Sequence, residues 1–142
     1  MPGVTAASEA SAELGISLTR RGLARKVAFV TPRAGVDQPE NDWAASVLAA
    51  DTSVIYMGAG LAEAIVEALI GRGLHPATPV AVVENASLPG SRILRGSLAE
   101  LPLLAKALGA GPAVILLGEV LRESATRAAA LPDDLRALLK RA

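Results

Sequence analysis

The chain has 142 residues, and its 14 basic and 14 acidic side chains give a formal net charge of zero, which excludes a strong global attraction to nucleic acid or to an anionic membrane surface. The absence of cysteine excludes disulfides, thiolate metal sites and a cysteine nucleophile. Apolar residues make up 51% of the chain and aromatic residues only 2%, so the core of what we expect to be a single domain must consist of Ala, Val, Leu and Ile.

The N-terminal half is predicted to begin with a helix and to continue with strands and a second helix. Thr5 is a suitable N-cap for the first helix, and Gly15 is a suitable C-terminal stop. The stretch Lys26–Arg33 predicts a strand. A polar, breaker-rich loop follows, and Asp42 then caps a short helix. The apolar, β-branched run TSVIYM (residues 52–57) predicts a central, buried strand.

The C-terminal half continues the alternation of helix and strand. Ser97 and Glu100 in "SLAE" have the spacing of a capping box, in which each side chain bonds the backbone N–H of the other residue, and this box opens a helix to about Leu108. The other elements expected here are a buried helix over Leu61–Arg72, a buried strand over Pro79–Asn85, a shorter strand over 91–96, a strong strand over 112–120, and an Ala-, Leu- and Arg-rich helix over Ser124–Ala142.

Strands that alternate with helices predict the α/β class, with a mixed, mostly parallel sheet flanked by helices. Ligands of such sheets bind at the carboxyl ends of the strands. We therefore expect a site among Met57–Gly60, Glu84–Ser87 and Gly118–Glu119. The single histidine, His75, cannot form a zinc site alone and is interpreted as an ordinary loop residue. No run is long enough for a membrane span and no signal pattern is present, so we expect a cytoplasmic protein with no membrane or nucleic-acid partner.

One interpretation of the glycines after the buried strand is a Rossmann-type dinucleotide site. Gly58 and Gly60 have the spacing of the first two glycines of G-x-G-x-x-G, and Glu84 ends the next strand, where an acid would bind a ribose hydroxyl. The third glycine position is Glu63, however, and a carboxylate there would repel a pyrophosphate from the helix N-terminus. The simpler alternative is that the glycines only let the chain turn sharply.

A second interpretation rests on seven stretches in fixed order. They are PGVTAA (2–7), GISLTRRGLARKVAFVT (15–31), DW (42–43), VIYMG (54–58), PVAVVENAS (79–87), RILRGSLAEL (92–101) and PAVILLGEV (112–120). Together they resemble the C-terminal lobe of the tetrapyrrole (corrin/porphyrin) methylases, most of all the uroporphyrinogen-III C-methyltransferases. The resemblance covers residues 2–122. We therefore divide the chain into the C-terminal lobe of the tetrapyrrole methylase fold, residues 1–122, and a helical tail of the same domain, residues 123–142.

The resemblance implies transfer of a methyl group from S-adenosyl-L-methionine, with S-adenosyl-L-homocysteine as product, to a carbon of uroporphyrinogen III, giving precorrin-2 for siroheme or cobalamin synthesis. A methylase acting on a later corrin precursor is the alternative within the family. The cofactor-binding residues implied are Thr5, Ala6, Met57, Ala86 and Ala113. Thr5 and Ala6 open a predicted helix, whose first N–H groups are unpaired. Without the resemblance, Thr5 would be interpreted only as a cap and Met57 equally well as a core residue.

The resemblance also implies that Arg20 and Arg21 bind the carboxylates of a tetrapyrrole substrate, to which arginine forks are well matched. Many relatives have histidine where Arg20 stands, which leaves the contact at this position open. A solvated loop of arginines is the alternative. No metal site and no catalytic residue is predicted.

The family's N-terminal lobe, which carries its acid and base residues, precedes the PGVTAA stretch. We therefore expect this chain to need that lobe or a separately encoded equivalent as a partner, and to lack turnover alone. The family forms homodimers, and we expect a homodimer here. The alternative outside enzymology is a non-catalytic dimerisation or binding remnant.

Overall fold

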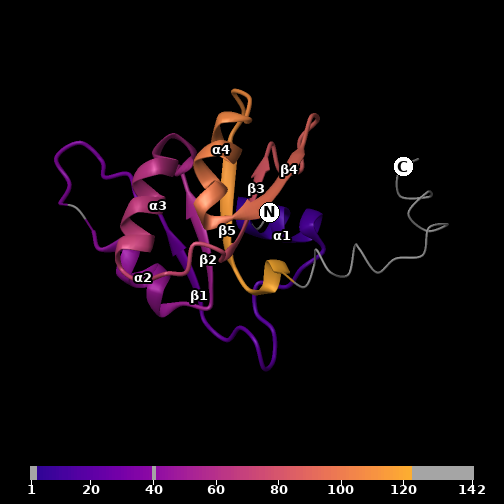
Figure 1. Cartoon of the computed structure of the whole chain (residues 1–142). Coiled ribbons are helices and arrows are strands. Elements are labelled where there is room, and N and C mark those ends of the chain that lie inside the picture. Colours follow the sequence, from indigo (N-terminus) through magenta and orange to yellow (C-terminus); the bar gives the residue numbers. More distant parts are fainter. Residues whose placement is uncertain (1–2, 40, 123–142) are drawn as a thin grey trace.

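The computed structural model describes residues 3–39 and 41–122, which form a five-stranded mixed sheet with helices on both faces (Figure 1). The helices are α1 (Ala6–Leu14), α2 (Trp43–Ala49), α3 (Ala62–Gly71) and α4 (Leu101–Lys106), with the short 3-10 helices η1 (Ala59–Leu61) and η2 (Leu98–Glu100). The strands are β1 (Val27–Val30), β2 (Thr52–Tyr56), β3 (Pro79–Glu84), β4 (Arg92–Ser97) and β5 (Ala113–Gly118). The predicted helix Ser124–Ala142 and the division at residue 122 involve residues outside the described range.

The strand order is β1-β2-β5-β3-β4, and the prediction of a mostly parallel sheet is wrong for neighbouring strands. Among the described strands, β1 and β2 pair in parallel, whereas β2–β5, β5–β3 and β3–β4 pair antiparallel. The helical connections do give β1, β2 and β3 one common direction. The loop 85–91 is too short for a crossover, which needs a dozen or more residues. Therefore β4 turns back as a hairpin partner, and β5 enters in reverse between β2 and β3.

Alternating side chains of the buried strands supply two separate apolar layers. Val80 and Val82 of β3 face a core that includes residues of α2, α3 and α4, whereas Ala81 and Val83 face a second core under α1. This period-two alternation is what a sheet covered on both sides requires. Within the described ranges, no helix is long and apolar enough to cross a membrane.

The predicted helix ends are confirmed. The Thr5 hydroxyl oxygen accepts a hydrogen bond from the Ala7 N–H at 3.4 Å, and Gly15 ends α1 in the left-handed region, with φ 67°. Asp42 caps α2 by accepting from the Ala45 N–H at 3.3 Å. The Glu100 carboxylate accepts from the Ser97 N–H at 2.8 Å, and this bond and one from the Ser97 hydroxyl lower the pKa of Glu100.

Candidate functional site

The last residues of β2 and β3 and the first residue of β5 meet at one edge of the sheet, and a pocket lies there. Tyr56 at the end of β2 lies opposite Val114, and Glu84 at the end of β3 lies opposite Ala113. A cavity of about 210 Å³ opens at this edge, which we call the strand-edge pocket. Its lining residues are Ala6, Tyr56, Met57, Val83, Ala86, Pro112, Ala113 and Val114. Four of the five residues predicted to bind a cofactor are therefore brought together from four separate segments.

The reversed direction of β5 decides which end of this strand reaches the pocket. Because β5 runs antiparallel to both neighbours, its first residue, Ala113, joins the ends of β2 and β3. The predicted search position Gly118–Glu119 is wrong, since Gly118 pairs with Thr52 at the opposite edge. The Cβ of any other residue at Gly118 would lie 2.6 Å from the Asp51 carbonyl oxygen, so this glycine has a packing role.

The backbone beside the pocket is left-handed at three non-glycine residues. Met57 has φ 53°, Asn85 has φ 54° and Ser87 has φ 59°. Outside glycine and asparagine this conformation is uncommon, and such residues cost on the order of 1–3 kcal/mol each and cluster at ligand sites. Met57 is 62% exposed as a residue and lies at the pocket rather than in the core. The observed position therefore disfavours its interpretation as a core methionine.

The start of α1 forms one side of the pocket. Thr5 is hydrogen-bonded through its hydroxyl to the Tyr56 hydroxyl, and it also caps the helix, so the cap interpretation is correct but incomplete. Ala6 lines the pocket as the first residue of α1, where no helical carbonyl reaches its N–H. This arrangement places one free helix-start N–H beside an apolar cavity.

The opposite side is built from two segments that are held together. The Asn85 N–H donates to the Pro112 carbonyl at 2.8 Å. The Glu84 side chain is 3% exposed and forms an ion pair of 2.9 Å with Arg92, which also donates to the Ala107 carbonyl at 2.7 Å. The Glu84 Oε1 atom has no hydrogen-bond partner among the described residues, but it is buried beside Gly109 and does not line the pocket. A carboxylate enclosed in this way is not open to a ribose hydroxyl, so the geometry disfavours the dinucleotide interpretation of Glu84.

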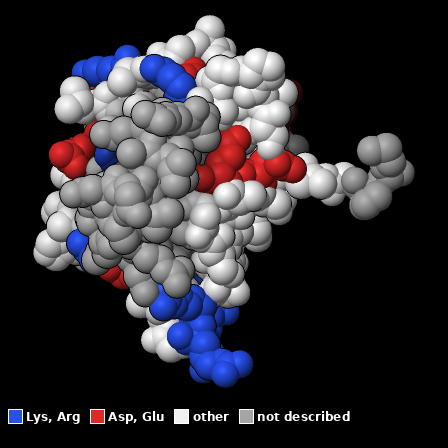
Figure 2. All heavy atoms as spheres, turned by 90° about the vertical axis from the view of Figure 1, so that its right-hand side faces the viewer, with Lys and Arg blue, Asp and Glu red and all other residues white. Residues whose placement is uncertain are grey.

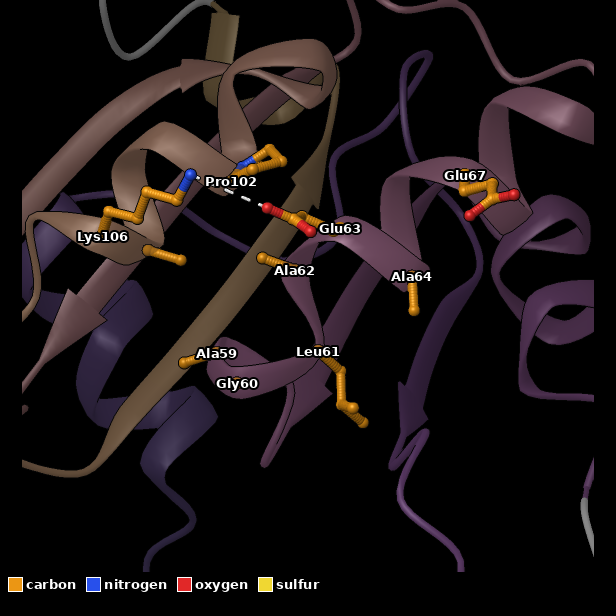
Figure 3. Close-up of a pocket in the computed structure, with 10 residues that line it drawn as sticks. Ala59, Gly60, Leu61, Ala62, Glu63, Ala64, Glu67, Pro102 and Lys106 are labelled. Atoms are coloured by element: carbon orange, nitrogen blue, oxygen red, sulfur yellow. Dashed lines mark ion pairs between the residues drawn. The ribbon is translucent and has the colours of Figure 1, made fainter.

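A larger hollow of about 610 Å³ lies between α3 and α4 (Figure 3). It includes Gly60 and the first turn of α3, where a dinucleotide would place its pyrophosphate. Glu63 points into this region towards Lys106, with 3.7 Å between the carboxylate and the ammonium nitrogen, whereas Glu67 points away (Figure 3). Glu63 therefore keeps a carboxylate in the first turn of α3, where the dinucleotide motif has its third glycine.

Arg20 and Arg21 lie far from the strand-edge pocket. They belong to a tight turn that is closed by an isolated antiparallel β-bridge between Arg20 and Ala24. This turn precedes β1, at the edge of the sheet opposite the pocket. Cationic side chains gather at the lower end of the molecule in Figure 2, at the height where Figure 1 places this turn. The structure therefore does not bring the predicted substrate residues to the predicted cofactor residues.

The remaining candidates carry no separate site. His75 accepts a hydrogen bond from the Ala77 N–H at 3.0 Å within its own loop, as expected for an ordinary loop residue. Within residues 3–39 and 41–122, no group of three or more metal-ligating side chains is present.

The residues of the strand-edge pocket that the sequence did not predict are Tyr56, Val83, Pro112 and Val114. Tyr56 and Pro112 directly precede predicted residues, and a signal for the other two would have required the strand register.

The fold and the pocket together define an α/β lobe that offers a small, largely apolar ligand site at a sheet edge. Similarity to known proteins makes the class specific. The model of the Tetrapyrrole (Corrin/Porphyrin) Methylases matches residues 1–102, and the chain belongs to this family.

Curated relatives and solved structures agree with this membership. A siroheme synthase of Tolumonas auensis is 44% identical over 95% of this chain and 27% of its own length, and one of Zymomonas mobilis is 44% identical over 84% and 25%. The uroporphyrin-III C-methyltransferase of Thermus thermophilus in complex with S-adenosylhomocysteine is 34% identical, with a TM-score of 0.70 over 86% of this chain and 52% of its own. The chain thus spans about a quarter of these relatives and half of this structure.

Proposed function

We propose that this chain is the C-terminal lobe of an S-adenosylmethionine-dependent uroporphyrinogen-III C-methyltransferase. The reaction proposed is methylation of uroporphyrinogen III to precorrin-2, for siroheme or cobalamin synthesis. The observation that carries this proposal is the convergence of Ala6, Met57, Ala86 and Ala113 on one pocket. The S-adenosylhomocysteine complex of a structural neighbour supports the choice of cofactor.

The pocket residues fit a flat, apolar part of such a cofactor. Three alanines, Ala6, Ala86 and Ala113, leave space at the walls, and the thioether of Met57 is a soft, polarizable contact for an aromatic ring. Ligand pockets are usually about 300–1,000 Å³. A cavity of about 210 Å³ is therefore suited to part of the cofactor, with further contacts supplied by the other lobe.

The mechanism assigned to these residues is binding and orientation. When bound, S-adenosylmethionine would supply an electrophilic methyl group on its sulfonium sulfur, and S-adenosylhomocysteine would be the leaving group. In-line displacement depends mainly on positioning of the two reactants. The lining consists of Ala, Val, Pro, Met and Tyr side chains, so this wall fixes the cofactor's position and excludes water, and it supplies no carboxylate or imidazole.

The test is a calorimetric titration of S-adenosylhomocysteine into the purified chain. We expect micromolar binding that weakens about fivefold in Met57→Ala, because a sulfur–aromatic contact contributes about 1 kcal/mol. Leu103→Ala is the matched control, since Leu103 is also a strongly exposed apolar residue but lies on α4 outside the pocket. An absence of heat at millimolar ligand would show that this lobe alone does not form the site.

We further propose that the purified 142-residue chain does not methylate uroporphyrinogen by itself, because one wall cannot hold both reactants. Recovery of activity on addition of a separately expressed N-terminal lobe would support the proposal. Robust turnover by the chain alone would contradict it.

A further inference from the structure

The loop 85–91 between β3 and β4 is bound to α1 by two glutamates. The Ser87 N–H donates to Glu13 Oε1 at 2.6 Å. The Ser87 hydroxyl donates to the Glu9 carboxylate, and the Ser91 hydroxyl donates to Glu13 Oε2. These bonds join residues separated by 74 to 78 positions in the chain. They therefore connect two segments that both contribute to the strand-edge pocket.

We propose that Glu9 and Glu13 are positioning residues that hold Ala86 against the strand-edge pocket and thereby set its affinity for the adenosyl cofactor. This inference rests on the proposed function. Neither glutamate lines the pocket; each acts through Ser87, the residue that follows Ala86.

Apart from these bonds, the loop is held mainly at its start, where the Asn85 N–H donates to the Pro112 carbonyl and Ala86 packs against the core under α1. Asn85 and Ser87 are both left-handed, so the loop is locally unfavourable and must be stabilised by other contacts. Leu88 is exposed, and the bonds within the loop are two short-range turns, Leu88 N–H to Asn85 and Ser91 N–H to Leu88. Bonds to a carboxylate are stronger than neutral ones, so the two glutamates are suited to hold such a segment.

The helix that carries the glutamates is itself firmly placed. Ala7 and Ala10 are fully buried in the core under α1, and Thr5 is bonded to Tyr56 of β2. The bonds from Ser87 and Ser91 lower the pKa of Glu13, which keeps this carboxylate ionised as an acceptor. The same helix thus supplies Ala6 to one side of the pocket and holds Ala86 on the other.

The experiment compares the wild-type chain with the double variant Glu9→Ala, Glu13→Ala. We expect the dissociation constant for S-adenosylhomocysteine to rise about tenfold and amide hydrogen exchange over 86–91 to become faster. The double variant should still fold, because Glu9 and Glu13 are only half-buried and alanine favours helix, but its thermal midpoint should fall with the loss of the three loop bonds. The pair Glu9→Gln, Glu13→Gln keeps two acceptors and should recover part of the affinity. Glu67→Ala, an exposed glutamate on α3, is the matched control.

The two readouts separate this inference from the proposed function. If the wild-type chain does not bind S-adenosylhomocysteine, this lobe alone does not form the cofactor site, and hydrogen exchange still tests the anchoring. Unchanged exchange over 86–91 in the double variant would overturn the positioning role whatever the binding result. Faster exchange with unchanged affinity would overturn the link between the loop and the pocket.

Discussion

Gly58 and Gly60 stand two positions apart and have opposite steric requirements. A Cβ atom at Gly58 would lie 2.9 Å from Ile55 Cγ2 and 2.9 Å from Ile65 Cδ1, whereas a Cβ at Gly60 would meet nothing within 4 Å. The first glycine is therefore needed for close packing of the chain against the core. This packing explains the glycine after β2 without any phosphate ligand.

We predict that Gly58→Ala lowers the free energy of unfolding by about 1–3 kcal/mol, the usual effect of overpacking a core. Gly60→Ala should change it by less than about 0.5 kcal/mol, as is typical of open surface positions. Urea denaturation of both variants measures the difference. Equal effects of the two substitutions would contradict this account.

At the scale of single residues, the sequence predicted half of the residues that line the pocket through the family resemblance, and little of the pocket through physics. Ala6 and Ala86 carry no chemical signal of their own, since alanine is also a frequent residue of this core. Arg20 carries a clear chemical signal, yet it lies at the opposite edge of the sheet. Side-chain chemistry could not reveal these positions, because each depends on where the strand next to it ends.

Asp51 links the segment before β1 to the start of β2 by hydrogen bonds. Its Oδ2 accepts hydrogen bonds from the Arg25 N–H at 2.8 Å and the Lys26 N–H at 3.0 Å. The Arg25 bond is the largest cause of the lowered pKa of Asp51, followed by the Lys26 bond. The ionised carboxylate therefore stabilises the connection between the two parallel strands.

We predict that Asp51→Asn weakens the acid dependence of stability. A pKa lowered below its ordinary value of 3.8 means that the ionised group contributes fully above that pH, and that the contribution is lost as the pH falls towards the folded-state pKa. Thermal midpoints below about pH 4 should therefore fall less steeply in the variant than in the wild type. Asp37→Asn, in the loop before α2, is the control and should leave the slope unchanged. If the thermal midpoint of Asp51→Asn fell with pH as steeply as that of the wild type, the prediction would be contradicted.

At the scale of elements, the sequence predicted the strands well and their directions only in part. Each buried run became a strand, and the caps at Thr5, Asp42 and Ser97 begin helices as expected. The direction of β5 was not predictable from its own residues, because an apolar run buried on both faces reads the same in either direction. This one reversal decides that Ala113, rather than Gly118, reaches the pocket.

Three exposed apolar residues, Val4, Phe29 and Met57, lie next to Thr5, Tyr56 or the pocket itself, and we call them the apolar patch. Phe29 stacks on Tyr56 with ring centroids 6.4 Å apart and remains 54% exposed. Val4 and Met57, which are next to Thr5 and Tyr56, are also exposed. Exposed patches of this kind mark interaction surfaces more often than isolated residues do.

We predict that the purified chain self-associates as a dimer or a larger assembly through this patch. Sedimentation at micromolar concentrations should show the assembly, and Phe29→Ser should shift it towards monomer. Val36→Ser is the control, because Val36 is exposed alone in the loop before α2. A wild-type chain that sediments only as monomer would refute the prediction. If the chain associates but binds no cofactor, the result would support the alternative of a non-catalytic dimerisation module.

The position of β5 has a consequence for how the molecule is made. It is the last described strand along the chain and the central strand of the sheet. During synthesis the β1–β2 pair and the β3–β4 hairpin emerge first, and the edges of β2 and β3 that β5 later covers have no strand partner until then. Only when residues 113–118 leave the ribosome do these edges close. The edge of β2 that β5 covers therefore stays unpaired while residues 57–112 are made, a stage at which a chaperone has the most to protect.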